Sequence, residues 1–258
     1  MALARITHAG ACLPALSAAH LQRAGFGPIP TYQKVVRKGV SVSDTAEKLV
    51  EEARQLIVNA GYHGFSYADL SKRFGIRKAS IHHHFPAKVD LAVAVVEQAR
   101  RAIQAQIAAL ESGTPVAIEQ LAAYTGYWER CILDRTAPFC IAGVLAAELP
   151  SLPPELGVAV RGHFSDLNKW LEHVLMLGVK QGSMSLQNTP AIEAQNFLAA
   201  VYGAMLAARA FDDPGKFSAI VEALVHRIRV KSHPGARPKG SRDGNNALGK
   251  ARKRAKGQ

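Results

Sequence analysis

Apolar residues recur at helical spacing along most of this sequence, and no other feature constrains the fold as strongly. Leu49, Ala53, Leu56, Ile57 and Ala60 fall on one face of a helix. The same spacing continues almost to residue 229, and no alternating strand pattern competes with it. The sequence therefore predicts an all-α fold of about nine helices.

Glycine, proline and polar clusters divide this pattern into segments, since proline cannot continue the hydrogen-bond ladder of a helix. We expect helices over residues 44–60, 66–74, 77–84, 91–110, 115–133, 141–149, 155–181, 190–211 and 216–230. They form two units, a three-helix domain at 43–91 and a helical domain at 92–230.

Positive charge is concentrated at the two ends of the chain. The 258 residues carry a net charge of +12, of which residues 1–42 supply +5, residues 231–258 supply +8 and residues 43–230 supply −1. A high overall pI is therefore weak support for a DNA-binding core. We expect poorly ordered basic ends. The alternatives are an N-terminal arm that follows DNA phosphates and a C-terminal electrostatic tether.

Several classes of protein are disfavoured. Cys12, Cys131 and Cys140 have no zinc-ligand spacing, and an odd, sparse count fits a reducing compartment. Nucleotide-binding glycine motifs, a nucleophile-elbow serine and a metal-ligand set are not found in the sequence. No apolar run approaches the roughly 20 residues that span a bilayer. We expect a cytoplasmic, non-enzymatic protein without cofactor or metal.

Residues 43–91 have the pattern of a helix-turn-helix. Gly61 can end the first helix, Ser66 to Asp69 is a capping box with Asp in place of Glu, and Gly75 allows a tight turn. The residues expected to face inward are Phe65, Ala68, Leu70, Phe74, Ile76, Ile81 and Phe85.

The second helix of this motif has the composition of a helix that reads DNA. Residues 72–88 include five basic side chains and no acid, namely Lys72, Arg73, Arg77, Lys78 and Lys88. Small Ala79 and Ser80 allow close approach to base edges. His82, His83 and His84 are consecutive, so they point about 100° apart and cannot converge on one metal ion. We expect His82 and His83 to face DNA.

The run from Ala60 to Leu70, the run from Gly75 to Phe85 and Lys88 together closely resemble the N-terminal domain of the tetracycline-repressor (TetR/AcrR) family. The resemblance implies a homodimeric repressor that a small molecule releases from a palindromic operator. It implies base contacts on the reading helix and phosphate contacts elsewhere, by Arg77, Lys78, Ala79, Ser80, His82, His83, Ser66, Tyr67 and Lys88. His82 stands where the family often has Tyr, so that contact is expected to be weaker or pH-dependent.

Residues 138–153 are similar to a branch of this family that responds to acrylate or N-ethylmaleimide, which implies that Cys140 can sense electrophiles. A helix N-terminus would favour its thiolate. The alternative is that Cys140, like Cys131, is a small buried packing residue. Aromatic and polar side chains suggest an effector pocket for a small apolar or carbonyl-bearing ligand, lined by Tyr124, Tyr127, Trp128, Phe139, His163, Phe164, Trp170 and His173.

Small residues in 190–211 would let two helices approach closely, so we expect a homodimer through about 190–230. Burial within one subunit is the competing interpretation of the same residues. The function predicted is a DNA-binding repressor released by a small or electrophilic effector. The alternatives are a repressor of an efflux pump that answers a non-reactive lipophilic ligand, and a non-specific architectural DNA-binding protein.

Overall fold

The computed structural model describes residues 44–135, 137 and 139–230, and this part of the chain is all-α, as the periodicity predicts. It contains nine α-helices and one short 3-10 helix. Their bounds are α2 (Asp44–Ala60), α3 (Tyr67–Phe74), α4 (Lys78–His84), α5 (Lys88–Gly113), α6 (Ala117–Leu133), α7 (Ile141–Glu148), η2 (Leu149–Ser151), α8 (Pro154–Lys180), α9 (Pro190–Phe211) and α10 (Gly215–Ile228).

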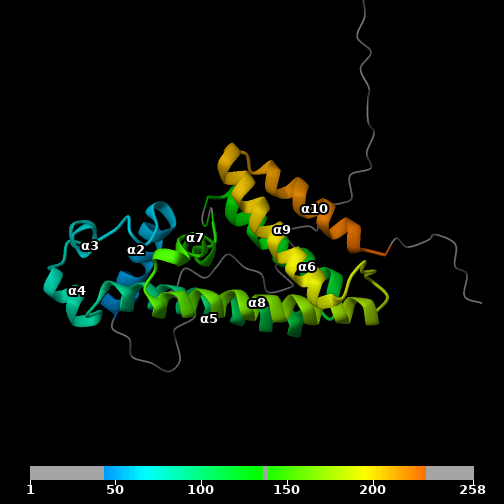
Figure 1. Ribbon diagram of the computed structural model, residues 1–258, viewed down its shortest axis with the longest axis horizontal. Coiled ribbons are helices and arrows are strands. Elements are labelled where there is room, and N and C mark those ends of the chain that lie inside the picture. The colour runs from blue at the N-terminus through cyan, green and yellow to red at the C-terminus, as the bar shows by residue number, and fades with distance from the viewer. Residues whose placement is uncertain (1–43, 136, 138, 231–258) are drawn as a thin grey trace, which may run out of the picture.

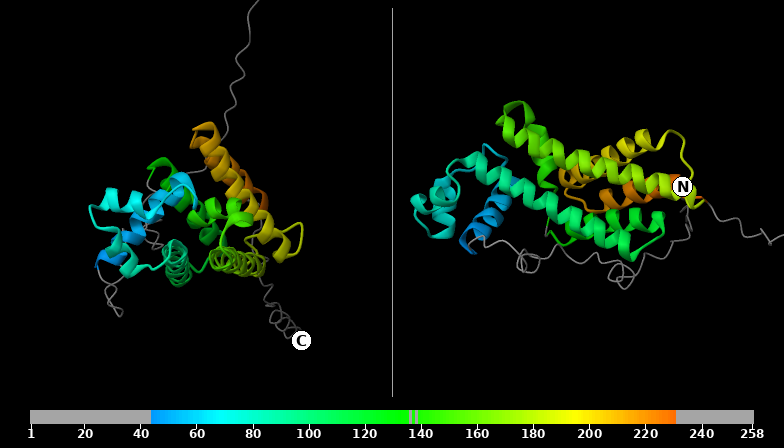
Figure 2. Two further views of the ribbon diagram at one scale, coloured as in Figure 1. Left: turned by 60° about the vertical axis from the view of Figure 1, so that its left-hand side comes forward. Right: turned by 90° about the horizontal axis from the view of Figure 1, so that it is seen from below.

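The two longest helices, α5 and α8, run side by side and set the long axis of the molecule (Figures 1 and 2). Helices α2, α3 and α4, which we call the reading head, lie at one end of this pair. Helices α9 and α10 pack against each other and against α8 and α6 at the other end. Helix α7 lies between the reading head and the rest of the molecule, in contact with α2, α5 and α8.

The residues that end the first helices behave as their chemistry predicts. Gly61 and Gly75 have φ of 75° and 69°, in the left-handed region that glycine enters without a Cβ penalty. The Ser66 side chain accepts from the Asp69 amide, and the Asp69 side chain accepts from the Ser66 amide, which confirms the capping box. These caps fix the short connections between α2, α3 and α4.

Two hydrophobic cores are present, and one of them joins the reading head to the helices behind it. The first core unites α6, α8, α9 and α10. The second includes Leu49, Leu70 and Ile81 of the reading head together with Leu145 of α7 and Leu156 of α8. Since α5 also runs without a break through residue 91, the reading head is packed directly on the remainder of the chain.

Some local predictions were wrong. Ala68 is exposed, and Tyr67 occupies the buried position at the start of α3 instead. Helix α5 begins at Lys88 rather than Leu91, because Asp90 reaches back to accept from the Ala87 amide. The predictions for residues 1–42, including Cys12, and for Ser43 and residues 231–258 lie outside the described residues. Within the described part of the chain, no helix is long and apolar enough to cross a membrane.

Candidate nucleic-acid interface and effector region

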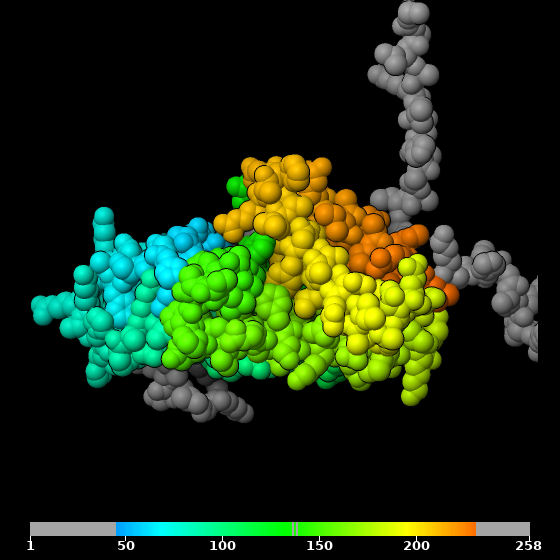
Figure 3. Space-filling view, in the orientation of Figure 1, coloured from blue at the N-terminus to red at the C-terminus, as the bar shows by residue number. Residues whose placement is uncertain are grey.

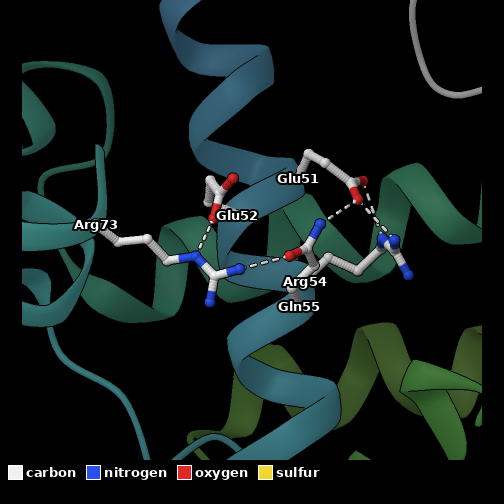
Figure 4. Close-up of polar contacts among 5 residues, drawn as sticks. All are labelled: Glu51, Glu52, Arg54, Gln55 and Arg73. Carbon is white, nitrogen blue, oxygen red and sulfur yellow. Dashed lines mark hydrogen bonds and ion pairs between the residues drawn. The ribbon is translucent and has the colours of Figure 1, made fainter. Parts of the chain in front are cut away.

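Helix α3 is fastened to α2 by an ion pair that uses one of the predicted DNA-facing cations. Arg73 Nε lies 2.5 Å from Glu52 Oε2, and Arg73 Nη2 donates to Gln55 Oε1 at 2.7 Å (Figure 4). Within α2, Glu51 accepts a hydrogen bond from Arg54 at 2.6 Å. In this conformation the Arg73 guanidinium is paired with α2 while its side chain stays 44% exposed, so a phosphate contact by Arg73 stays a prediction.

Helix α4 presents its polar residues outward. Ile81 is 0% exposed and anchors the helix to the core of the reading head. The predicted base-contacting residues all lie on the exposed side of this anchor, namely Arg77, Lys78, Ala79, Ser80, His82 and His83. His84 is half-buried, whereas His82 and His83 are exposed. The space-filling view shows this end of the molecule projecting beyond the helices behind it (Figure 3).

His82 is held in a defined orientation. Its Nδ1 lies 3.0 Å from the Pro86 carbonyl, and its ring meets the Tyr67 ring edge-on with centroids 4.8 Å apart. Because a carbonyl only accepts, Nδ1 carries the hydrogen of this bond. The Nε2 atom is left for any contact that His82 makes outside the protein.

Two residues carried over as phosphate contacts have partners within the chain. Tyr67 is 8% exposed, and its hydroxyl lies 2.8 Å from the Phe85 carbonyl and 2.7 Å from the Ala87 carbonyl. Burial raises the pKa of Tyr67 to about 12, which keeps it a donor. Ser66 donates to Asp69 Oδ2 at 2.6 Å. In this conformation Tyr67 fixes the link between α4 and α5, and Ser66 caps α3.

Lys88, the third predicted phosphate contact, lies half-buried at the first position of α5. Its Nζ is 4.5 Å from the ring centroids of both Tyr62 and Phe65, a cation–π arrangement. Burial lowers the pKa of Lys88, while the charges of Asp69 and Glu148 oppose that shift. A phosphate contact by Lys88 would exchange ring contacts for an ion pair.

Behind the reading head, a buried polar cluster joins three helices. Cys140 occupies the N-cap position of α7 and is 4% exposed. Its Sγ lies 3.7 Å from His163 Nε2 of α8 and 3.2 Å from the Tyr202 hydroxyl of α9. Burial alone would raise the pKa of the Cys140 thiol, but His163 and Tyr202 bring it below its ordinary value. The pKa of His163 is raised: burial opposes this, but the bond to Cys140 outweighs it.

The predicted pocket residues differ in burial, and most of them lie in the core. Tyr124, Tyr127, Trp128, Phe139, His163 and Trp170 are buried, Phe164 is half-buried and His173 is exposed. Tyr124 and Trp170 meet edge-on at 5.3 Å. Within the described residues, the polar atoms of Tyr124, Trp128 and Trp170 and Nδ1 of His163 have no hydrogen-bond partner. Burial raises the pKa of the Tyr124 hydroxyl, and the neighbouring Trp128 partly opposes that rise. The Tyr124 hydroxyl and the Trp128 indole N–H nevertheless do not have the geometry of a hydrogen bond.

Comparison with known proteins decides the family. Residues 49–95 match the family described as bacterial regulatory proteins, tetR family. A TetR-family transcriptional regulator from Agrobacterium tumefaciens is 48% identical, with a TM-score of 0.70, over 72% of this chain and 97% of that one. The chain belongs to the TetR family of transcriptional regulators.

TetR-family regulators are generally non-enzymatic proteins that bind operator DNA. More distant structures show the same fold. The reduced form of Escherichia coli NemR is 23% identical with a TM-score of 0.65, over 74% of this regulator and all of that chain. A Legionella pneumophila TetR regulator is 24% identical with a TM-score of 0.64, over 74% and 100%. No curated protein matches the regulator.

The outer face of α9 and α10 in this TetR regulator carries several exposed apolar side chains among polar ones. Leu206 and Phe211 are 59% and 70% exposed, and Ile192 and Ile220 are also exposed. Gly203 is exposed, with no atom within 4 Å of the position a Cβ would take, whereas Ala204 and Ala208 are buried within the subunit. Some small residues of α9 therefore pack inside the subunit, and others lie on its surface.

Sequence reasoning missed two residues of these sites. Tyr202 was assigned to the dimer helix, yet its hydroxyl reaches Cys140 and His163. Glu148 received no role, yet it bonds to the reading head. Neither has a local sequence signal, because the partners lie 39 to 86 residues away in the chain.

Proposed function

We propose that this chain is a homodimeric repressor that binds a palindromic operator through α4 and leaves it when a small molecule binds among α6, α7, α8 and α9. The observation that carries the proposal is the exposed, acid-free face of α4 on a buried Ile81 anchor. A helix with small residues at its start and basic residues beside it suits entry into a major groove.

The proposed base-contacting residues lie on α4 or at its N-cap, and Arg77 and Lys78 supply charge for nearby phosphates. The full set proposed from the family is Ser66, Tyr67, Arg77, Lys78, Ala79, Ser80, His82, His83 and Lys88. Ser66, Tyr67 and Lys88 would have to leave or share their present partners, so we assign them a smaller part.

The apolar outer face of α9 and α10 supports pairing of two subunits through residues 190–230. Two helices from each subunit would form a four-helix interface, and its two-fold symmetry would repeat in the operator. Exposed Leu206 and Phe211 are otherwise costly to leave in water.

The buried donors support an effector that carries hydrogen-bond acceptors. An unpaired buried polar group costs about 1–3 kcal/mol, which a ligand oxygen would recover. The indole N–H groups of Trp128 and Trp170 only donate, so a carbonyl oxygen between aromatic rings suits them. The proposed lining is Tyr124, Trp128, Phe139, His163 and Trp170, with Cys140 at its edge. A lipophilic carbonyl compound expelled by an efflux pump would fit the same lining.

A second, reactive effector is favoured by the contact of Cys140 with His163 and Tyr202. An α,β-unsaturated carbonyl would react by addition of sulfur to its β-carbon. The thiol proton would pass to His163 Nε2, the C=C electron pair would move to the α-carbon, and that carbon would then take a proton. Because Cys140 is 4% exposed, α7 must first open to admit the reagent.

The test begins with selection of bound sequences from random DNA, followed by mobility shift on the selected site. We expect the selected site to be a palindrome. The substitutions K78A and S80A should weaken the complex, and the control substitution E111A at an exposed position should not. Binding that shows no sequence preference would overturn the proposal and favour an architectural protein. Removal of residues 1–42 and 231–258 should leave the preference intact.

The effector is identified by release of that complex. If an α,β-unsaturated carbonyl releases wild-type protein but not C140S, the thiol is the sensor. Equal release of both proteins would remove the thiol reaction and leave reversible binding.

A further inference from the structure

Helix α2 ends in a way that leaves one backbone amide to be satisfied from outside the reading head. The Gly61 amide donates to the Ile57 carbonyl at 2.8 Å, which is the single bond of the left-handed capping motif. The next amide, of Tyr62, donates instead to the carboxylate of Glu148, 3.0 Å from Oε2 and 3.3 Å from Oε1. The first amide after the left-handed Gly61 is thus satisfied by the last residue of α7.

The position of Glu148 is unfavourable for its own helix. A carboxylate at a helix C-terminus faces the negative end of the helix dipole. The carboxylate is also packed so closely on Gly61 that a Cβ there would come within 2.1 Å of Oε1. Glycine at position 61 therefore allows both the positive φ of 75° and the close approach of the Glu148 carboxylate.

Contacts around this bond extend it into a junction. His63 Nε2 lies 3.2 Å from Ser151 Oγ of η2, and that hydroxyl donates to the Glu148 carbonyl at 2.9 Å. The Lys88 ammonium lies over the Tyr62 ring. Burial lowers the pKa of Lys88, and the charge of Glu148 partly opposes that shift. The junction therefore joins the connection between α2 and α3 to the start of α5, the helix that follows α4.

We propose that Glu148 is the positioning residue through which α7 sets the orientation of the reading head. This rests on the proposed function, since Cys140, the N-cap of α7, lies beside the proposed effector site. The eight residues of α7 span about 12 Å, so this short helix joins the buried cluster to the Tyr62 amide. A shift of α7 would break or re-aim the Glu148 bond, and the reading head would lose its fixed angle.

The first experiment measures amide hydrogen exchange at Tyr62 in the full chain without DNA. In E148A we expect exchange faster by about tenfold or more, the change that corresponds to loss of a hydrogen bond to a charged group. E148Q keeps one acceptor oxygen and should restore part of the protection. E111A is the matched control, since Glu111 is an exposed acid in the last turn of α5, and it should match wild type. Wild-type exchange in E148A would overturn the proposal.

The second experiment separates positioning from general stability. Affinity for the selected operator should fall in E148A and partly recover in E148Q, while the midpoint of urea unfolding of the first core, formed by α6, α8, α9 and α10, remains at the wild-type value. Unchanged operator affinity in E148A would also overturn the proposal. If E148A does not fold, E148Q carries the same comparison at smaller amplitude. Failure of the repressor proposal would appear as non-specific DNA binding in wild type, which leaves the exchange result to stand by itself.

Discussion

Arg73 and Arg77 lie on either side of the turn at Gly75, and the structure pairs Arg73 with α2 while Arg77 is exposed at the N-cap of α4. We predict that R73Q lowers the stability of the reading head and leaves the salt dependence of DNA binding unchanged. R77Q should do the reverse. The pair is matched in chemistry, since both changes replace a guanidinium by an uncharged amide.

The magnitudes follow from the contacts. The Arg73 and Glu52 side chains are 44% and 27% exposed, so solvent screens their ion pair, and its loss costs about 0.5–1 kcal/mol. Arg77 is exposed, so its loss should change stability by less than about 0.5 kcal/mol. If Arg77 neutralises one phosphate per subunit, a dimer loses roughly 1.8 from the slope of log K against log salt concentration.

The assay is fluorescence anisotropy with the selected operator over a series of KCl concentrations, combined with urea unfolding of each variant. A fall in the salt slope of R73Q as large as that of R77Q would refute the reasoning. It would mean that Arg73 leaves Glu52 for a phosphate in the complex. In that case, the acid-free run from residue 72 to residue 88 would act as one basic surface.

Three further outcomes are expected. I81A should cost about 2–5 kcal/mol in urea unfolding, since Ile81 is 0% exposed in the reading-head core, and a smaller loss would show that the core relaxes around the cavity. L206E should convert a dimer to a monomer in sedimentation velocity, because it places a charge on the apolar face of α9; a persistent dimer would exclude this face. The hydrogen bond from Arg100 holds the pKa of Asp166 below its ordinary value. The resulting stabilisation is complete above the unfolded pKa of about 3.9 and is lost as pH falls through the folded value. The difference in Tm between wild type and D166N should therefore shrink from pH 5 to pH 3, and a constant difference would show that the pair is not ionic.

The helix-turn-helix could be predicted from the sequence because its signals are local. Ser66 and Asp69 are three residues apart, and Gly75 needs no distant partner to adopt a positive φ. Inward and outward positions on α4 follow from a period of 3.6 residues around Ile81. The error at Ala68 arose because the hydroxyl of neighbouring Tyr67 finds two carbonyls inside the fold, so that the aromatic residue takes the buried place.

The effector region was predicted only as a set of residue types. Aromatic residues on helices indicated a core or a pocket, and the spacing could not say which polar atoms would lack partners. Cys140 was singled out for its place at a helix start, but its partners His163 and Tyr202 come from two other helices.

The sequence by itself determined the class of the fold, most of the helix ends and the reading helix, because caps, turns and periodicity act over a few residues. The tertiary structure decided the use of each charged or polar side chain. Arg73 pairs with Glu52 of α2, Cys140 meets His163, and Glu148 accepts from the Tyr62 amide that follows α2. These pairings depend on how the helices pack. Partners up to 86 positions apart leave no local sequence pattern from which the pairing could be predicted.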